Sequence, residues 1–376
     1  MLSRCKEESL IFLFKHVFSF LSGATAGDWF RLLAENGFAV DLPYWPRATL
    51  ITMGSLVNSL SRWREERAFA PVAAKVQVQP PLFILGHWRH GTTHLHNLLA
   101  IDKQFAYPYP LEVCYPHSFL SKKPATADLI GSLVPKRRLQ DNIRLGMQEP
   151  QEDESALCLT TFTSPFMSWV FPRRRAHYQR YLSFRGVPEK EVVKWKEAFL
   201  LFMKKLTWKH RRPIILKSPP HTARIRLLLE LFPGARFVHI QRNPYVVFQS
   251  TQHLEKTAIL AMHLQRPCWH DLDDMILRRY QALYDAFFEE RALIPKGQLH
   301  EVRFEDIEKD PLTEMNKLYN ALHIPGFGEV QPALKHYVNG LSTYRKNRYT
   351  SLPSRQRRRV AEQWQRSFQA WDYPVA

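Results

Sequence analysis

The sequence predicts an α/β protein whose core is a mainly parallel sheet flanked by helices. Four short apolar segments have the length of buried strands, and helical periodicity follows each of them. They are residues 80–86, 213–217, 235–241 and the start of 298–307. Because strands and helices alternate, right-handed crossovers between parallel strands are expected. A chain of 376 residues without internal repeats can bury one large core of this kind.

A helix is predicted next to each strand in the sequence. Leu95, Leu98 and Leu99 lie on one face of the helix after the first strand. A long helix from Pro188 precedes the second strand, and residues 223–232 form the next helix. The third strand leads into a helix that begins near Pro244, where proline costs no hydrogen bond. The fourth strand runs into a helix capped near Asp310 and Pro311.

The remaining segments flank or interrupt this core. Residues 1–80 are expected to form a helical extension packed on a domain of residues 81–376. Apolar residues recur there at three- and four-residue spacing, namely Trp29, Leu32, Leu33, Leu50, Met53, Leu56, Val57 and Leu60. The apolar stretch at 9–21 is too short to span a bilayer. It predicts an amphipathic helix, either packed on the body or resting on a membrane surface.

Composition restricts the cellular context and the partners. The net charge of +18 favours anionic partners such as nucleotides, sulfated or phosphorylated substrates, nucleic acid or acidic lipid surfaces. Four scattered cysteines without a CxxC pair favour a reduced, cytoplasmic setting and argue against a disulfide framework and a zinc ribbon; they are Cys5, Cys114, Cys158 and Cys268. A peripheral membrane contact stays open, and no pattern indicates an oligomeric state.

The turn after the first strand has the residues of a phosphate-binding loop. Its sequence is Arg89-His90-Gly91-Thr92-Thr93, and a helix follows at once. Unpaired backbone N–H groups and the helix dipole stabilise an anion at such a helix start. Gly91 allows close approach, the threonines add hydroxyl donors, and Arg89 adds a guanidinium. A kinase would instead end this loop in Gly-Lys-Ser/Thr.

A metal site is not expected here, although four histidines lie close together in sequence at 87, 90, 94 and 96. No third ligand follows His90 and His94 at a supportive spacing, and His90 lies in the turn. The surrounding positive charge also opposes a cation. Packed or surface histidines are the better interpretation.

A second anion site is predicted after the third strand. Arg242 closes that strand, and Ser250 follows eight residues later on the next helix. Ligands of open parallel sheets bind beyond the carboxyl ends of the strands. Arg242 and Ser250 can therefore hold a second phosphate, with a structural ion pair of Arg242 as the alternative.

Three motifs in this order resemble a known family. They are GHWRHGTTHL, the run from LKSPPHTARI to NPYVVFQST, and EVRFEDIEKDP. Together they resemble the sulfotransferases that use 3′-phosphoadenosine 5′-phosphosulfate (PAPS), and most closely the bacterial branch related to tyrosylprotein and cytosolic sulfotransferases. The resemblance covers about residues 80–350 and implies a P-loop-like fold.

The resemblance implies roles for individual residues. The segment from Arg89 to Thr93 matches the loop that holds the 5′-phosphosulfate, except that His90 replaces the usual serine. Arg242 and Ser250 match the pair that holds the 3′-phosphate. Lys217 matches the lysine that reaches the bridging oxygen and the sulfonate. The segment YRKNRY resembles the motif that completes the 3′-phosphate site, with Arg345 and Lys346 as candidates.

The general base has several candidates. In the tyrosylprotein branch it is a glutamate after the first helix, and Glu112 lies two residues beyond that place. The acidic cluster Glu152-Asp153-Glu154 starts a helix, where burial beside other carboxylates can raise a pKa. Helix capping is the alternative for this cluster. We rank Glu112 and Glu154 equally, with His221 behind them.

The function expected is metal-independent, in-line transfer of the sulfuryl group from PAPS to a hydroxyl acceptor, with Arg89 and Lys217 stabilising the charge. The insertion at about 103–210 exceeds an ordinary crossover and is expected to form the acceptor side. Rings beside arginines at 163–175 suit an amphiphilic or acidic acceptor. Two alternatives are a P-loop kinase-like phosphotransferase and a basic nucleic-acid-binding protein. The latter is disfavoured because basic residues do not alternate with aromatics on one module.

Overall fold

A computed structural model describes residues 19–122, 146–341, 349 and 351–375. The chain divides into two compact units that alternate along the sequence. The helical unit comprises residues 1–78, 108–211 and 254–270, and the sheet unit comprises 79–107, 212–253 and 271–376. Each unit is described by itself. The apolar stretch at 9–21 lies almost entirely outside the described residues.

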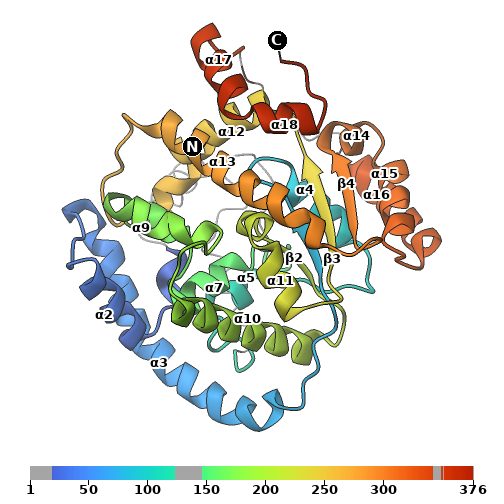
Figure 1. The fold of residues 1–376 in the computed structure, drawn as a ribbon. Helices are drawn as coiled ribbons and strands as arrows, with labels where there is room; N and C mark the ends of the chain where they lie inside the picture. The colour runs from blue at the N-terminus through green and yellow to red at the C-terminus, as the bar shows by residue number, and fades with distance from the viewer. Residues whose placement is uncertain (1–18, 123–145, 342–348, 350, 376) are drawn as a thin grey trace, which may run out of the picture. The chain divides into compact units, whose positions relative to one another are not determined.

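The sheet unit contains four parallel strands in the order β2-β1-β3-β4. Their bounds are β1 Leu82–Leu85, β2 Ile215–Lys217, β3 Arg236–Gln241 and β4 Leu299–Arg303. Strands β3 and β4 lie side by side in Figure 1. Ile84 pairs with Lys217 on one side and with Val238 on the other. The prediction of an α/β fold with a parallel sheet is therefore confirmed, and all four strands fall within their predicted segments.

The strand order has a topological switch point between β1 and β3, and the region beyond the carboxyl ends of these two strands is called the crevice below. The chain leaves β1 toward β2 on one side, and it leaves β3 toward β4 on the other. Adjacent strands whose connections diverge leave a gap beyond their carboxyl ends, and ligands of open α/β sheets bind there. The turns that follow β1 and β3 therefore border the same crevice.

Helices flank the sheet in the same unit. Their bounds are α4 Thr92–Leu99, α11 Ile225–Leu231, α12 Pro244–Lys256, α13 Leu272–Glu290, α14 Phe304–Lys309, α15 Pro311–Ala321, α16 Phe327–Gly340, α17 Ser354–Gln363 and α18 Gln365–Ala370. The last three residues of α12 belong to the helical unit. Leu95, Leu98 and Leu99 join the buried core together with strand residues and side chains of α15 and α16. Asp310 caps α15 as expected, because its side chain accepts a hydrogen bond from the Thr313 backbone.

The helical unit has no strand among its described residues. Its α-helices are α2 Ala26–Glu35, α3 Trp45–Ala73, α5 Pro110–Cys114, α7 Glu154–Thr161, α8 Met167–Val170, α9 Arg175–Gln179 and α10 Glu189–His210. Helices α2 and α3 lie side by side, and α10 packs on α7 (Figure 1). No helix in the described part of the chain is long and apolar enough to cross a membrane.

Helix α3 buries its polar face. Arg47, Asn58 and Glu65 are all buried, and each binds a partner within the unit. Arg47 donates to the His263 carbonyl, and Asn58 donates to backbone carbonyls of η1 (Phe20–Gly23) and its C-cap. Glu65 forms a buried ion pair of 2.8 Å with Lys205. The spacing of the apolar residues Leu50, Met53, Leu56, Val57 and Leu60 correctly predicted this helix. In the structure, however, these apolar side chains are exposed.

Candidate functional site

The turn between β1 and α4 depends on two glycines. Gly86 and Gly91 both have positive φ, where a side chain is strained. A Cβ on Gly86 would lie 2.9 Å from the Ile240 carbonyl oxygen, and one on Gly91 would lie 2.2 Å from a ring carbon of Phe304. The turn can therefore pass close to β3 and α14 only with glycine at these positions.

Arg89 adopts a left-handed backbone conformation with φ of 73°. This conformation costs a non-glycine residue free energy, and such residues concentrate at functional sites. The Nε atom of Arg89 donates a hydrogen bond of 2.8 Å to the Ser250 hydroxyl on α12. The side chain of Arg89 thus reaches from the first predicted anion site to the second.

Arg242 lies directly beyond β3 and supports the same turn. Its guanidinium donates a hydrogen bond of 2.8 Å to the Arg89 carbonyl, and it lies 4.1 Å from the centroid of the Phe304 ring. Burial lowers the pKa of Arg242, while the nearby Glu305 raises it. Because arginine titrates far above neutrality, Arg242 keeps its charge there. The residues of both predicted anion sites therefore meet at the crevice between β1 and β3.

Lys217 ends β2, beside β1, and its side chain is 2% exposed. Its Nζ lies 3.4 Å from the Thr93 hydroxyl, at the start of α4. Thr92 is buried at the first position of that helix. A buried ammonium group directed at a helix N-terminus adds positive charge where the backbone already favours an anion.

The side chain of His90 points into the core of the sheet unit and supports the turn there. Its ring is fully buried, and Nδ1 lies 3.1 Å from the Ile240 carbonyl oxygen and 3.1 Å from the Tyr284 hydroxyl. Burial lowers its pKa well below the ordinary value, and the nearby His87 lowers it further. The neutral ring is packed among aromatic side chains, so the side chain of His90 supports the turn from within the sheet unit.

Sequence reasoning missed two partners of this turn. The Tyr349 hydroxyl donates a hydrogen bond of 3.1 Å to Ser250, and the Thr222 hydroxyl accepts one of 2.7 Å from the Gly86 backbone. Tyr349 is the last residue of the YRKNRY segment, which was a usable signal. Arg345 and Lys346 of that segment lie outside the described residues. No comparable pattern marked Thr222.

Glu112, in the helical unit, is fully buried, and its carboxylate has several hydrogen-bond and charged partners. Its carboxylate accepts hydrogen bonds from the Tyr109 backbone at 2.8 Å and from His210 at 2.9 Å, and it pairs with Lys209 at 2.9 Å. Burial alone would raise the pKa of Glu112, but the hydrogen bond from His210 and the two positive partners outweigh it and lower the pKa. Such a carboxylate is ionised at neutral pH but accepts a proton weakly.

The other base candidates lie in both units. Glu154 is fully buried at the start of α7, and it accepts a hydrogen bond of 2.6 Å from the Ser164 hydroxyl. Glu152 is half-buried just before that helix. His221 is fully buried in the sheet unit, four residues beyond Lys217, with its ring edge-on to Phe83. Glu112 and Glu154 belong to the helical unit, whereas Lys217 and His221 belong to the sheet unit.

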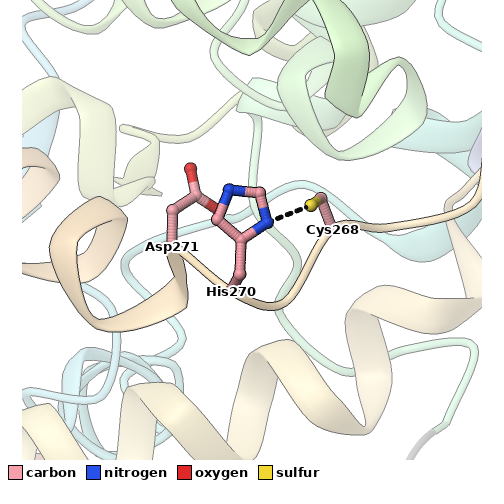
Figure 2. Close-up of side chains that lie close together, drawn as sticks. All are labelled: Cys268, His270 and Asp271. Atoms are coloured by element: carbon pink, nitrogen blue, oxygen red, sulfur yellow. Dashed lines mark hydrogen bonds between the residues drawn. The ribbon is translucent and has the colours of Figure 1, made fainter.

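Among the described residues, the turn between β1 and α4 holds no cluster of metal ligands. In the same described part of the chain, one group of possible ligands is found, at 268–271, where Cys268 and His270 are exposed and Cys268 Sγ lies 2.7 Å from His270 Nδ1 (Figure 2). The histidines at 87, 90 and 96 are instead buried side chains.

Comparison with known proteins identifies the family. A family model described as the sulfotransferase family matches residues 80–329. A 38% identical relative from Mycobacterium bovis and Mycobacterium tuberculosis, omega-hydroxy-beta-dihydromenaquinone-9 sulfotransferase Stf3, aligns over 91% of this chain and 88% of its own length. The chain belongs to the sulfotransferase family.

Solved structures of other sulfotransferases share the fold. STF9 from Mycobacterium avium is 19% identical, with a TM-score of 0.69 over 93% of this chain and 97% of its own. STF1 from Mycobacterium tuberculosis is 17% identical, with a TM-score of 0.65 over 90% of both chains. The family and the P-loop-like α/β fold implied by the sequence motifs are both confirmed.

Proposed function

We propose that this sulfotransferase uses PAPS as its donor and holds the nucleotide at both of its anionic ends. The Arg89–Thr93 turn with the start of α4 would bind the 5′-phosphosulfate, and Arg242 with Ser250 would bind the 3′-phosphate. The observation that carries this proposal is the chain of hydrogen bonds from Ser250 through Arg89 to Arg242 at one crevice. A donor with one anionic end would not need both arginines.

The chemistry proposed is in-line transfer of the sulfuryl group to an acceptor hydroxyl. The sulfur–oxygen bond to the 5′-phosphate breaks as a new bond to the acceptor oxygen forms, and adenosine 3′,5′-bisphosphate leaves. Negative charge spreads over the sulfonate oxygens and onto the leaving phosphate, as it does in phosphoryl transfer. Lys217, Arg89 and the amides of α4 would stabilise that charge.

The acceptor proton needs a base, for which Glu112 and Glu154 remain the leading candidates. Glu112 already accepts hydrogen bonds from His210 and the Tyr109 backbone, and its pKa is lowered. Its proton affinity is therefore small. Glu154 accepts a hydrogen bond of 2.6 Å from the Ser164 hydroxyl. Because the lowered pKa makes Glu112 the weaker base, Glu154 is the first candidate to test, with His221 as the third.

The acceptor proposed is a hydroxyl group on an amphiphilic molecule. The relative named above acts, by its name, on the ω-hydroxyl of a dihydromenaquinone. The aromatic rings of the helical unit, including Phe166, Trp169, Tyr178, Tyr181 and Phe184, are buried in its core, so the relative is what supports this acceptor. We infer a hydroxylated isoprenoid quinone as the first compound to test.

Two assays test this function. In the first, adenosine 3′,5′-bisphosphate is expected to raise the melting temperature more than ATP–Mg²⁺ or single-stranded DNA does. Stabilisation by ATP–Mg²⁺ alone would favour a phosphotransferase, and stabilisation by DNA alone would favour a nucleic-acid-binding protein. In the second, ³⁵S-labelled PAPS is incubated with hydroxylated and non-hydroxylated menaquinones. Label is expected only in the hydroxylated compound, and transfer only to short soluble alcohols would overturn the acceptor assignment.

A further inference from the structure

Helix α3 presents large apolar side chains to its surroundings. We call six of them, Trp45, Met53, Leu56, Val57, Leu60 and Trp63, the α3 outer face. Met53 is 64% exposed, Val57 is 66% exposed and Trp63 is 53% exposed. Their spacing places them on one side of the helix. Single exposed apolar residues are ordinary, but a continuous stripe of them marks an interaction surface.

Helix α3 cannot rotate to bury its apolar side, because the opposite side is held by specific contacts. It carries Arg47, Asn58 and Glu65, whose partners lie within the helical unit. Rotating the helix would bury the leucines but break these bonds, including the buried ion pair of Glu65 with Lys205. Breaking a buried pair is strongly destabilising. The apolar side is therefore fixed in its outward orientation.

The charges around the α3 outer face indicate what covers it. Residues 48–61 contain no charged side chain, and tryptophans lie at both ends of the stripe. At its C-terminal end Arg64 and Arg67 are exposed, and Arg67 lies 4.7 Å from the Trp63 ring centroid. The exposed Glu66 is paired with Arg62. Tryptophan, apolar side chains and arginine in this arrangement are typical of helices that lie in the interface of a bilayer.

We infer that the α3 outer face binds the surface of an anionic lipid bilayer, with α3 lying parallel to the membrane plane. The apolar side chains would enter the boundary between headgroups and acyl chains, while the arginines contact anionic headgroups. The net charge of +18 supports the same attraction. Phe30 and Leu42, elsewhere in the helical unit, are exposed as well. This inference goes beyond the proposed function, and its test requires no turnover.

Cosedimentation with lipid vesicles tests the inference. The full chain is expected to bind vesicles of phosphatidylcholine with 30% phosphatidylglycerol, and to bind pure phosphatidylcholine at least tenfold more weakly. The triple variant Met53→Gln, Val57→Gln, Leu60→Gln is expected to lower the partition coefficient at least tenfold. Its melting temperature and its affinity for adenosine 3′,5′-bisphosphate are expected to stay unchanged, since those side chains are already exposed.

A matched control comes from α10. Val193, Leu201 and Trp208 are 40–44% exposed in the same unit. Their replacement by glutamine removes as many exposed apolar groups and is expected to leave vesicle binding within twofold of the wild type. Wild-type-like binding by the α3 variant would overturn the inference, as would equal losses in both variants. A wild-type dimer that the α3 variant dissociates, without vesicle binding by either protein, would also overturn it and would identify a second copy as the partner.

Discussion

The Nε atom of Arg89 donates a hydrogen bond of 2.8 Å to the Ser250 hydroxyl, although 161 residues separate them in sequence. Arg89 belongs to the turn after β1, and Ser250 lies two turns into the helix after β3. The strand order places the loop after β1 and the start of the helix after β3 at the same crevice. The contact joins the two anion sites that the sequence suggested separately.

Replacing Ser250 by alanine is expected to weaken the binding of adenosine 3′,5′-bisphosphate by about tenfold to 150-fold. The variant removes the acceptor of the Arg89 hydrogen bond, and bonds to charged groups contribute about 1.5–3 kcal/mol. Isothermal titration calorimetry measures the effect. Tyr349→Phe, which removes only the neutral donor to Ser250, is expected to weaken binding less than threefold. Equal affinities in all three proteins would exclude Ser250 from the site.

Gly91→Ala is expected to impair donor binding because no Cβ fits at this position. The added atom would collide with the Phe304 ring, and the φ of +91° disfavours any side chain. We expect at least tenfold weaker binding of adenosine 3′,5′-bisphosphate together with a lower melting temperature. Gly27→Ala on α2 is the matched control, because nothing lies within 4 Å of the added Cβ. That variant is expected to be neutral or slightly stabilised, and wild-type-like behaviour of Gly91→Ala would refute the close approach.

Replacement of Lys217 and replacement of Lys205, both of them buried, are expected to have different effects. Lys217→Met is expected to lower kcat by about 100-fold to 1,000-fold, since it removes a charge aimed at the transferred group. Its affinity for adenosine 3′,5′-bisphosphate, which lacks the sulfuryl group, is expected to change less than threefold. Steady-state kinetics and calorimetry on the same preparation separate these effects.

Lys205→Met is the counterpart in the helical unit. It leaves Glu65 buried without its ion-pair partner, so we expect a loss of about 3 kcal/mol in the free energy of unfolding. Urea denaturation measures that loss. Equal losses of stability in the Lys205 and Lys217 variants would show that Lys217 is structural as well.

Glu112 is expected to stabilise the fold in a pH-dependent manner. The pKa of the Glu112 carboxyl is lowered in the folded chain, so its contribution is present above the ordinary pKa of about 4.3 and is lost as the pH falls through the lower folded value. Glu112→Gln should therefore cost about 2 kcal/mol at pH 7, and much less in strongly acidic buffer. Denaturation at several pH values measures the difference. A constant difference at every pH would contradict the assigned ionisation.

Activity measurements show whether Glu154 or Glu112 is the general base. Glu154→Gln is expected to lower kcat by at least 100-fold with little change in donor affinity, since general bases contribute about 10²–10⁴-fold. If Glu154→Gln retains full kcat while Glu112→Gln loses it at a temperature where that variant is still folded, the base is Glu112. The pH profile of kcat distinguishes this outcome from unfolding.

Local sequence patterns predicted the sheet and its turns well. A continuous apolar run that ends at Gly86 or Arg242 carries the signal of a buried parallel strand in its own composition. The resemblance of the motifs then indicated which residues after each strand bind the donor. Arg89, Arg242, Ser250 and Lys217 do lie around the two turns, but their roles as donor ligands stay predictions until a nucleotide is bound.

Long-range contacts were beyond the reach of sequence reasoning. The periodicity of Met53, Leu56 and Leu60 identifies a helix but not the face that is buried. That choice depends on partners such as Lys205, 140 residues away from Glu65. The low pKa of Glu112 likewise comes from Lys209 and His210, almost one hundred residues later in the chain.

Nucleotide affinities measured by calorimetry for the wild type and for Arg242→Ala test the central claim most directly. The wild type is expected to bind adenosine 3′,5′-bisphosphate at least tenfold more tightly than adenosine 5′-monophosphate, because only the former reaches Arg242 and Ser250. In Arg242→Ala that preference should disappear while the affinity for the monophosphate stays within threefold. An undiminished preference in Arg242→Ala would contradict the two-ended grip on the donor.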